Sequence, residues 1–269
     1  MPGLIPGDFM KWRWLSIVCF AAVVAIPACP RAEGMGDELP PCDMPADMTT
    51  PSAPLSRVSE ALAKGSVEIL ALGSGSTVGE AAGSNGPAFN YRMPEASFPR
   101  RMLEVLQTAR PAVTFDLTVK GGRNMTADTM YATLAQELTA HHYDLVLWQT
   151  GTVEAVRGLR PDTLRGVLEE GAEVAQQAGA DVVLIDPQFS RFLRANTDMN
   201  PYETVLEQIA GLPGVSLFRR YELTRGWVAN DQIDLERVDR NQRDKTVMLL
   251  NVCLGHALAR YVLTGAAEH

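Results

Sequence analysis

Short apolar runs alternate with longer helical patterns over most of this chain, and this alternation limits the possible folds more than any other feature. The apolar runs cover residues 67–72, 112–119, 144–148, 181–185 and 215–218. The helical patterns cover residues 98–109, 127–142, 161–178, 202–210 and 246–263. Strands that alternate with helices of this length form βαβ units, whose helices cover both faces of a parallel sheet. The sequence therefore predicts a three-layer α/β sandwich with a five-stranded parallel sheet.

The charge balance of the chain is acidic. Its 269 residues include 24 Lys and Arg against 32 Asp and Glu, which gives a formal charge of -8 at pH 7. We see no basic stripe that would override this balance. The composition therefore argues against a general affinity for nucleic acid phosphates or for anionic membrane surfaces.

The N-terminus has the features of a secretory signal peptide. Lys11 and Arg13 precede the apolar stretch WLSIVCFAAVVAIPA, and the small residue Ala28 comes directly before Cys29. A basic region, an apolar core and a small residue in this order predict a signal peptide over residues 1–28, and export to the periplasm or cell envelope. The sequence IPAC also resembles a lipoprotein processing site, at which Cys29 would be lipidated.

The next segment, residues 29–56, is rich in Pro, Met, Asp and Thr and has no sustained period. This composition is typical of a tether or an irregular strap. We expect the folded domain to cover residues 57–269, and membrane contact to involve only the signal peptide or a lipid anchor. The oligomeric state does not follow from the sequence.

Three cysteines remain once Cys19 leaves with the signal peptide. Cys29 and Cys42 are the only close pair and could form a disulfide in an oxidising compartment. If Cys29 is lipidated or removed, Cys42 is left unpaired or pairs elsewhere. Cys253 lies in an apolar helical run, which is typical of a small buried side chain. No CxxC or Cys/His ligand spacing occurs, so we expect no zinc site, and no other metal or cofactor is indicated.

The first apolar run ends in a turn rich in glycine and serine, within the sequence VEILALGSGSTVGEAAG. Such a turn could bind a phosphate or present a nucleophile, because functional groups of α/β folds gather at the carboxyl ends of the strands. Gly73, Gly75 and Gly79 give GxGxxxG, which is one residue off the dinucleotide fingerprint, and an irregular stretch follows where that fingerprint needs a helix. Nucleotide binding is therefore disfavoured.

The turn sequence LALGSGSTVG resembles the first block of the SGNH (GDSL) hydrolases, G-D-S-x-T-x-G, and the resemblance extends to about residue 263. Gly121 and Gly122 follow the second strand, where the family places its oxyanion-hole glycine. The sequence DLVLWQTGT reaches Gly151 where the family has G-x-N-D, and ADVVLIDPQ is similar to the family's fourth strand. LFRRYELTRGWV is similar to a subgroup of exported rhizobial members. The resemblance implies a flavodoxin-like fold with strand order 2-1-3-4-5, and a lineage of esterases, lipases and carbohydrate O-acyl hydrolases.

The chain departs from this family at the residues that perform its chemistry. In a gap-free match Ser74 stands at the aspartate of the first block, and Gly75 stands at the nucleophilic serine. Val153 replaces the oxyanion-binding asparagine of the third block, and Glu154 replaces its aspartate. Glycine has no hydroxyl to attack an ester, valine cannot donate to an oxyanion, and an ionised glutamate would repel one.

The last block of the family, D-x-x-H, is absent as a pattern. No histidine has an aspartate three residues before it, and the block falls near Gln242 and Lys245 when the last helix is kept in register. Lys245 could act as a base beside a serine if burial lowered its pKa, but the surrounding run ERVDRNQRDK is typical of a solvated loop. His256, on the last helix, is more typical of a structural histidine.

Ser76 and Ser74 are the remaining candidates for a displaced nucleophile. Their other interpretation is local, since small hydroxyls commonly form hydrogen bonds to the backbone of a turn. Asp186 ends the fourth strand and is a candidate ligand contact, although a turn residue before Pro187 is the simpler interpretation.

These substitutions favour a degenerate hydrolase without efficient turnover, whose pocket at the strand ends binds an acyl or glycan ligand or a protein partner. The first alternative is an active serine esterase acting on esters or O-acyl carbohydrates. It would use Ser76 or Ser74 as the nucleophile, with Gly121 or Gly122 in the oxyanion hole. The second alternative is a folded spacer on a lipid anchor. On this sequence the question of enzyme or binding domain stays open.

Overall fold

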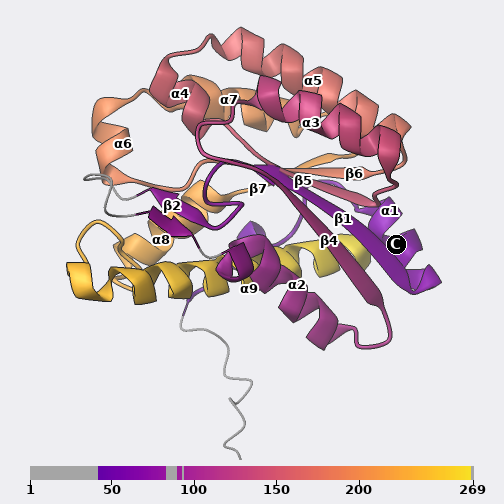
Figure 1. Cartoon of the computed structure of the whole chain (residues 1–269), viewed down its shortest axis with the longest axis horizontal. Coiled ribbons are helices and arrows are strands. Elements are labelled where there is room, and N and C mark those ends of the chain that lie inside the picture. The colour runs from indigo at the N-terminus through magenta and orange to yellow at the C-terminus, as the bar shows by residue number, and fades with distance from the viewer. Residues whose placement is uncertain (1–41, 83–89, 93, 268–269) are drawn as a thin grey trace, which may run out of the picture. The chain divides into compact units, whose positions relative to one another are not determined.

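The structure is a computed structural model and describes residues 42–82, 90–92 and 94–267 (Figure 1). The predicted signal peptide and the first part of the predicted tether lie outside these residues. The main sheet is parallel and contains, in spatial order, β4 (Thr114–Gly121), β1 (Ser66–Gly73), β5 (Leu145–Gln149), β6 (Asp181–Ile185) and β7 (Val215–Phe218). This is the order 2-1-3-4-5, so the predicted fold is confirmed.

The central strands are buried on both faces. Every residue of β5 and of β6 is buried, and β1 is buried from Ile69 to its end. Strands of a parallel sheet need such continuous apolar sequences, because helices cover both of their sides. The edge strand β4 is more exposed, and Phe115 is its one fully buried residue.

Helices cover both faces of the sheet (Figure 1). Alternate residues of β1 contribute to two separate cores, with Ile69 in the first and Leu70 in the second. The first core packs against α1 (Ser56–Lys64), α2 (Phe98–Ala109), α8 (Arg220–Ala229) and α9 (Arg243–Ala267). The second core packs against α3 (Ala127–Ala140), α5 (Pro161–Gln177) and α7 (Asn200–Ile209).

The predicted strands and long helices all occur, with bounds that agree or differ by a few residues. The elements that the sequence did not predict are short. They are α1, α8, α4 (Thr152–Arg157), α6 (Arg191–Asn196), the antiparallel pair β2 (Glu80–Ala82) and β3 (Asn90–Arg92), and the 3-10 turns η1 (Ala46–Met48), η2 (Pro94–Ala96) and η3 (Arg240–Gln242). α4 and α6, with six residues each, contain too few apolar residues to show a period.

Residues 42–55, which belong to the predicted tether, pack against the domain. Cys42 forms a disulfide with Cys253 of α9, with Cα atoms 6.1 Å apart. The backbone N of Leu55, a buried residue, donates to the carbonyl oxygen of Gly265 at 3.0 Å. Cys253 is buried, as predicted, but it is bonded and not a free apolar side chain. The pairing of Cys42 with Cys29 is therefore wrong, and the alternative that Cys42 pairs elsewhere is confirmed. Cys42 and Cys253 are 211 residues apart in sequence, so no local spacing indicated the bond.

One helical stretch of the described residues, 240–267, is long and apolar enough to cross a membrane by length and composition alone. It contains α9, whose Leu254, Leu258 and Val262 are buried in the first core. α9 also packs along α2 and α1. These contacts are those of a central helix of a folded domain.

Candidate functional site

The pairing of β1 with β4 brings two glycine blocks together at the carboxyl end of the sheet. Gly73 lies opposite Gly121, and the backbone N of Gly122 donates to the carbonyl oxygen of Gly73 at 3.2 Å. Gly121 has a φ of 141°, and a Cβ there would lie 1.9 Å from the Gly73 carbonyl oxygen. Only glycine fits so close to the neighbouring strand. The two glycines that the resemblance assigns to the oxyanion hole therefore lie beside the turn after β1.

The turn after β1 closes tightly around Gly75. The backbone N of Glu80 donates to the carbonyl oxygen of Gly75 at 2.6 Å. A Cβ on Gly75 would lie 2.5 Å from the carbonyl oxygen of Glu80, a backbone atom that cannot move without reshaping the turn. The position that corresponds to the nucleophilic serine therefore has no room for a side chain in this conformation.

The hydroxyls of the turn converge on the side-chain amide of Gln149, a buried residue at the end of β5. Its Oε1 accepts hydrogen bonds from the Ser74 backbone N at 3.1 Å and the Ser74 Oγ at 2.9 Å. It also accepts from the Thr77 Oγ1 at 3.0 Å and the Ser76 Oγ at 3.4 Å. A neutral amide oxygen can accept a hydrogen bond but is not a base that removes a hydroxyl proton. The arrangement holds the turn in place and does not activate a serine.

A buried arginine also contacts Ser76. Arg220 begins α8, and its Nη1 donates to the Ser76 Oγ at 3.2 Å. The guanidinium carbon lies 5.8 Å from the centre of the Phe98 ring, a distance at which a cation is attracted to the aromatic face. Burial lowers the pKa of Arg220 to about 10, so the group is charged at neutral pH. A guanidinium only donates hydrogen bonds and cannot take the serine proton.

Asp186 links this arginine to the end of β6. The Nε of Arg220 donates to the backbone oxygen of Asp186 at 3.0 Å, and the Asp186 Oδ1 accepts from the backbone N of Tyr221 at 2.8 Å. Burial raises the pKa of Asp186 to about 7, although the Tyr221 N–H and the charge of Arg220 act in the opposite direction. The carboxyl group therefore fixes the first turn of α8. These contacts agree with the interpretation of Asp186 as a turn residue. They give no evidence that Asp186 contacts a ligand.

In the third block, the side-chain oxygens of Glu154 accept hydrogen bonds mainly from backbone groups. The Glu154 Oε1 accepts from the backbone N of Ala127 at 2.5 Å and from the Thr150 Oγ1 at 3.2 Å. Its Oε2 accepts from the backbone N of Gly151 at 2.9 Å. Both side-chain oxygens of Glu154 therefore accept hydrogen bonds at the starts of α3 and α4, where such acceptors satisfy helix N-terminal N–H groups. Val153, next to it, has no side-chain donor.

The residues at the position of the last block do not reach the serine turn. Gln242 lies in η3 and Lys245 on α9, and both are exposed. His256 is half-buried on α9 and lines a separate hollow with Cys42 and Arg260; burial lowers the pKa of this histidine.

No general base accompanies the serines in the part of the chain that the structure describes. There, the hydroxyls of Ser74 and Ser76 form no hydrogen bond with Glu154, Lys245 or His256. The same residues contain no group of three His, Cys, Asp or Glu side chains placed to hold a metal ion. The geometry supports hydrogen bonding and packing and contains no assembled proton-transfer pair.

The sequence did not single out Gln149 or Arg220, which organise the turn. Each lies at the carboxyl end of a buried strand, Gln149 as the last residue of β5 and Arg220 two residues after β7. Polar residues at that edge of a parallel sheet are candidates for a site by position alone. This signal was present in WQTGT and LFRRY.

A comparison with protein families identifies the lineage. The model of the non-GDSL lipase-like family matches residues 41–268, a range that includes all of the residues that the structure describes. The chain belongs to this family. The strand order and the three layers of this chain are those of the SGNH-hydrolase α/β fold.

Solved structures similar to this family member are hydrolases of the same fold. One is Axe2, an acetylxylan esterase from Geobacillus stearothermophilus, with 17% identity and a TM-score of 0.54, covering 76% of this chain and 95% of Axe2. Another is LAE5, an alpha/beta hydrolase enzyme from the metagenome of Lake Arreo, with 16% identity and a TM-score of 0.51, covering 71% of this chain and 96% of LAE5. At such identities the likeness shows the fold alone. No curated protein matches the sequence significantly.

Proposed function

We propose that this lipase-like protein is a non-catalytic binding domain of esterase lineage, exported to the periplasm or cell envelope. One observation carries the proposal: the hydroxyls of Ser74 and Ser76 are bound to the Gln149 amide, with no base in hydrogen-bond reach among the described residues. Acyl transfer by a serine needs a base that accepts the hydroxyl proton and donors that face the oxyanion.

The conformation of the turn supports the same conclusion. Gly75 occupies the nucleophile position, and a side chain there would collide with the backbone of Glu80. Loss of one oxyanion donor alone costs about 2.7–4 kcal/mol of barrier. Loss of the nucleophile and of its base removes the covalent route altogether.

The remaining functional groups at the strand ends suit a binding role. Of the groups at this edge, Gly121 is exposed and Gly122 half-buried, so their backbone is accessible to an acyl or glycan ligand, and a protein partner would be bound through the same edge of the sheet. Nucleic acid is not a proposed partner, because the chain is acidic.

Export is supported by two features of the chain. The sequence of residues 1–28 has the order of a signal peptide. The disulfide between Cys42 and Cys253 is of a kind that persists in oxidising compartments outside the cytosol. We propose that any membrane association runs through the N-terminal segment, by the signal peptide or by lipidation of Cys29.

The experiment that tests the proposal is labelling of the purified mature protein with a fluorophosphonate probe, analysed by intact mass and peptide mapping. The probe reports an activated serine without knowledge of the substrate, and an active SGNH esterase serves as the positive control. We expect no adduct. An adduct on Ser76 or Ser74 would overturn the proposal and make the protein an active serine esterase with a displaced nucleophile.

A further inference from the structure

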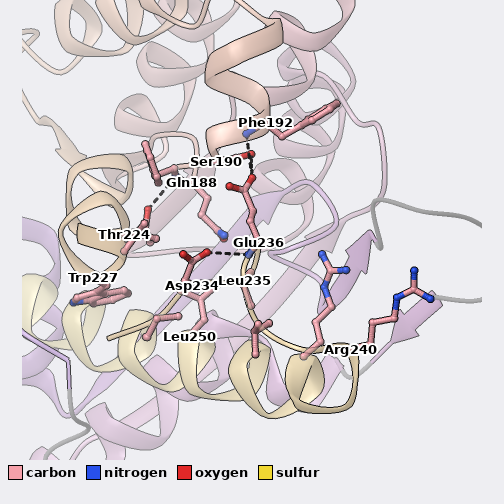
Figure 2. Close-up of a pocket in the computed structure, with 15 residues that line it drawn as sticks. Gln188, Ser190, Phe192, Thr224, Trp227, Asp234, Leu235, Glu236, Arg240 and Leu250 are labelled. Carbon is pink, nitrogen blue, oxygen red and sulfur yellow. Dashed lines mark hydrogen bonds between the residues drawn. The ribbon is translucent and has the colours of Figure 1, made fainter. Parts of the chain in front are cut away.

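A cavity of about 770 Å³ is lined by none of the glycine and serine groups described above (Figure 2). Its walls come from the loop after β6, from α6 and α8, from residues 233–238, and from the start of α9. This volume is within the range of small-molecule sites. The question is which ligand its chemistry would select.

The floor of the cavity is apolar. It is formed by Trp227, Val228, Ile233, Leu235 and Leu250. Phe192, on α6 at the rim, is the most exposed large apolar side chain among the described residues, with 67% of its surface accessible. An apolar wall with an aromatic side chain at its rim suits an alkyl chain.

The carboxylates at the rim are already satisfied by protein groups. Asp234 accepts from the Arg191 Nη1 at 2.8 Å. Glu236 accepts from the Ser190 Oγ at 2.6 Å and from the backbone N of Arg191 at 2.9 Å and of Phe192 at 3.2 Å, as Figure 2 shows at the start of α6. These bonds hold residues 234–236 against α6 and neutralise part of the acidic charge.

Two arginines at the other end of the cavity are not neutralised in this way. Arg240 and Arg243 line the cavity from η3 and the start of α9, and neither guanidinium forms an ion pair with any carboxylate of the described residues. Figure 2 shows Arg240 rising from this end. The cavity therefore combines an apolar floor with a positive end, in a protein whose net charge is negative.

We propose that this cavity binds a single-chain amphiphile with an anionic head group. The alkyl chain would lie on the apolar floor, and the carboxylate or phosphate would bind to Arg240 and Arg243, whose planar groups suit either anion. The inference rests on the proposed non-catalytic function, because it assigns the protein a ligand that is retained and not hydrolysed. It places that ligand in a cavity that no serine lines except Ser190, whose hydroxyl is bound to Glu236.

Calorimetric titration of the folded mature protein tests the proposal. The probes are dodecanoate and dodecyl phosphate, each below its micelle concentration, with dodecyltrimethylammonium as the charge-reversed amphiphile and acetate as the head group alone. We expect saturable binding of at least one anionic amphiphile, and at least about tenfold weaker binding of the cation and of acetate. The better of the two anions identifies a carboxylate or a phosphate head group. Equal binding of the cation, or no binding of either anion, would overturn the proposal.

Variants locate the site. Arg240→Gln with Arg243→Gln should weaken binding of the anion by about tenfold or more. The control is Arg157→Gln with Arg160→Gln, which removes the same charge from exposed residues on α4 and before α5 and should change binding less than about twofold. Val228→Trp, which fills the cavity from α8, should abolish binding and keep the melting temperature within a few degrees. Full binding by the Arg240/Arg243 variant, or by a folded Val228→Trp variant, would place the ligand elsewhere.

The two proposals can fail separately. If the protein is labelled by fluorophosphonate and also binds the amphiphile, the non-catalytic function is overturned and the assignment of the ligand to this cavity stands. No labelling and no amphiphile binding would leave the non-catalytic function and overturn the assignment of this cavity.

Discussion

The guanidinium of Arg220 donates to the hydroxyl of Ser76 across 144 residues of sequence, and so connects the start of α8 to the turn after β1. The same arginine contacts the backbone of Asp186 after β6. Gln149, at the end of β5, accepts hydrogen bonds from the hydroxyls of Ser74, Ser76 and Thr77 in the same turn. The carboxyl ends of four strands, β1, β5, β6 and β7, are therefore joined by a polar network, at the edge of the sheet where α/β folds of this kind carry their functional groups.

Restoring the serine of the family motif should not restore activity. We expect Gly75→Ser to destabilise the protein by about 1–3 kcal/mol, because the new side chain collides with the Glu80 carbonyl oxygen 2.5 Å away. The variant should stay unlabelled by fluorophosphonate, since no base accompanies it. Urea unfolding followed by circular dichroism measures the loss.

The matched control for this variant is Gly122→Ser, in the neighbouring glycine pair. Its Cβ would meet only the Met125 sulfur, at an ordinary 3.8 Å. Unfolding free energies that are equal for the two variants would show that the Glu80 carbonyl oxygen does not exclude a side chain from position 75.

Removing the shared acceptor should loosen the turn. Gln149→Leu keeps the side-chain size but leaves the half-buried backbone N of Ser74 and the buried hydroxyl of Thr77 without their partner. An unsatisfied buried donor costs about 1–3 kcal/mol, so the free energy of unfolding should fall by at least that amount. The exposed Gln177, which bonds to Glu173 within α5, provides the control, and Gln177→Ala should stay within about 0.5 kcal/mol of the wild type.

The buried carboxyl of Asp186 should make stability depend on pH. Its pKa is raised by burial from 3.8 to about 7, so the folded state holds a proton that the unfolded state releases. The contribution of Asp186 to stability is therefore complete below pH 3.8 and is lost as the pH rises to about 7. Asp186→Asn keeps an acceptor for Tyr221 N and does not titrate.

The measurement is the difference in unfolding free energy between Asp186→Asn and the wild type, taken at intervals of pH. This difference should rise in favour of the variant between pH 3.8 and about 7 and level off above that range. Taking the difference removes the contribution of other carboxyls, such as Asp181, whose pKa burial raises to about 6. A difference that is flat across this range would show that Asp186 is ionised in the folded state throughout.

The disulfide should contribute strongly to stability. Cys42→Ala with Cys253→Ala removes a cross-link between residues 211 apart in sequence, and the expected loss is about 2–5 kcal/mol. Calorimetric melting with and without reductant measures it. Reductant should lower the melting temperature of the wild type and leave that of the double variant unchanged. Equal melting of both proteins under oxidising conditions would show that the bond does not constrain the fold.

The fold was predictable because its signals are local and repeated. The apolar runs of β6 and β7 and the period of α2 are contained in single stretches of sequence, and their predicted bounds agree with the structure. The alternation of these strands and helices along the chain indicated a parallel sheet, and the glycine blocks supported the resemblance that gave its strand order. α4 and α6, with six residues each, were missed because so short a helix leaves no period to detect.

The sequence predicted where the candidate site lies, but it predicted few of the contacts within it. The glycine pair and the serine turn do meet at the sheet edge, as the motif order suggested. The partners of the serines could not be read from the sequence, because Gln149 and Arg220 reach them from elements 75 and 144 residues away. The bonding of Glu154 to the start of α3 depends equally on tertiary packing. Each of these contacts depends on how the strands are arranged in the fold, and no local sequence pattern predicts it.

The bond between Cys42 and Cys253 also determines how the domain responds to mechanical load. Without it, tension on the chain ahead of residue 42 would act directly on the segment up to α1, which is otherwise held by non-covalent contacts such as those of Leu55 with Gly265 and of Trp227 with Asp43. With it, the pull enters α9 in the middle of the first core. To unfold the domain from that side, the pull must then also displace a helix that is buried in the core.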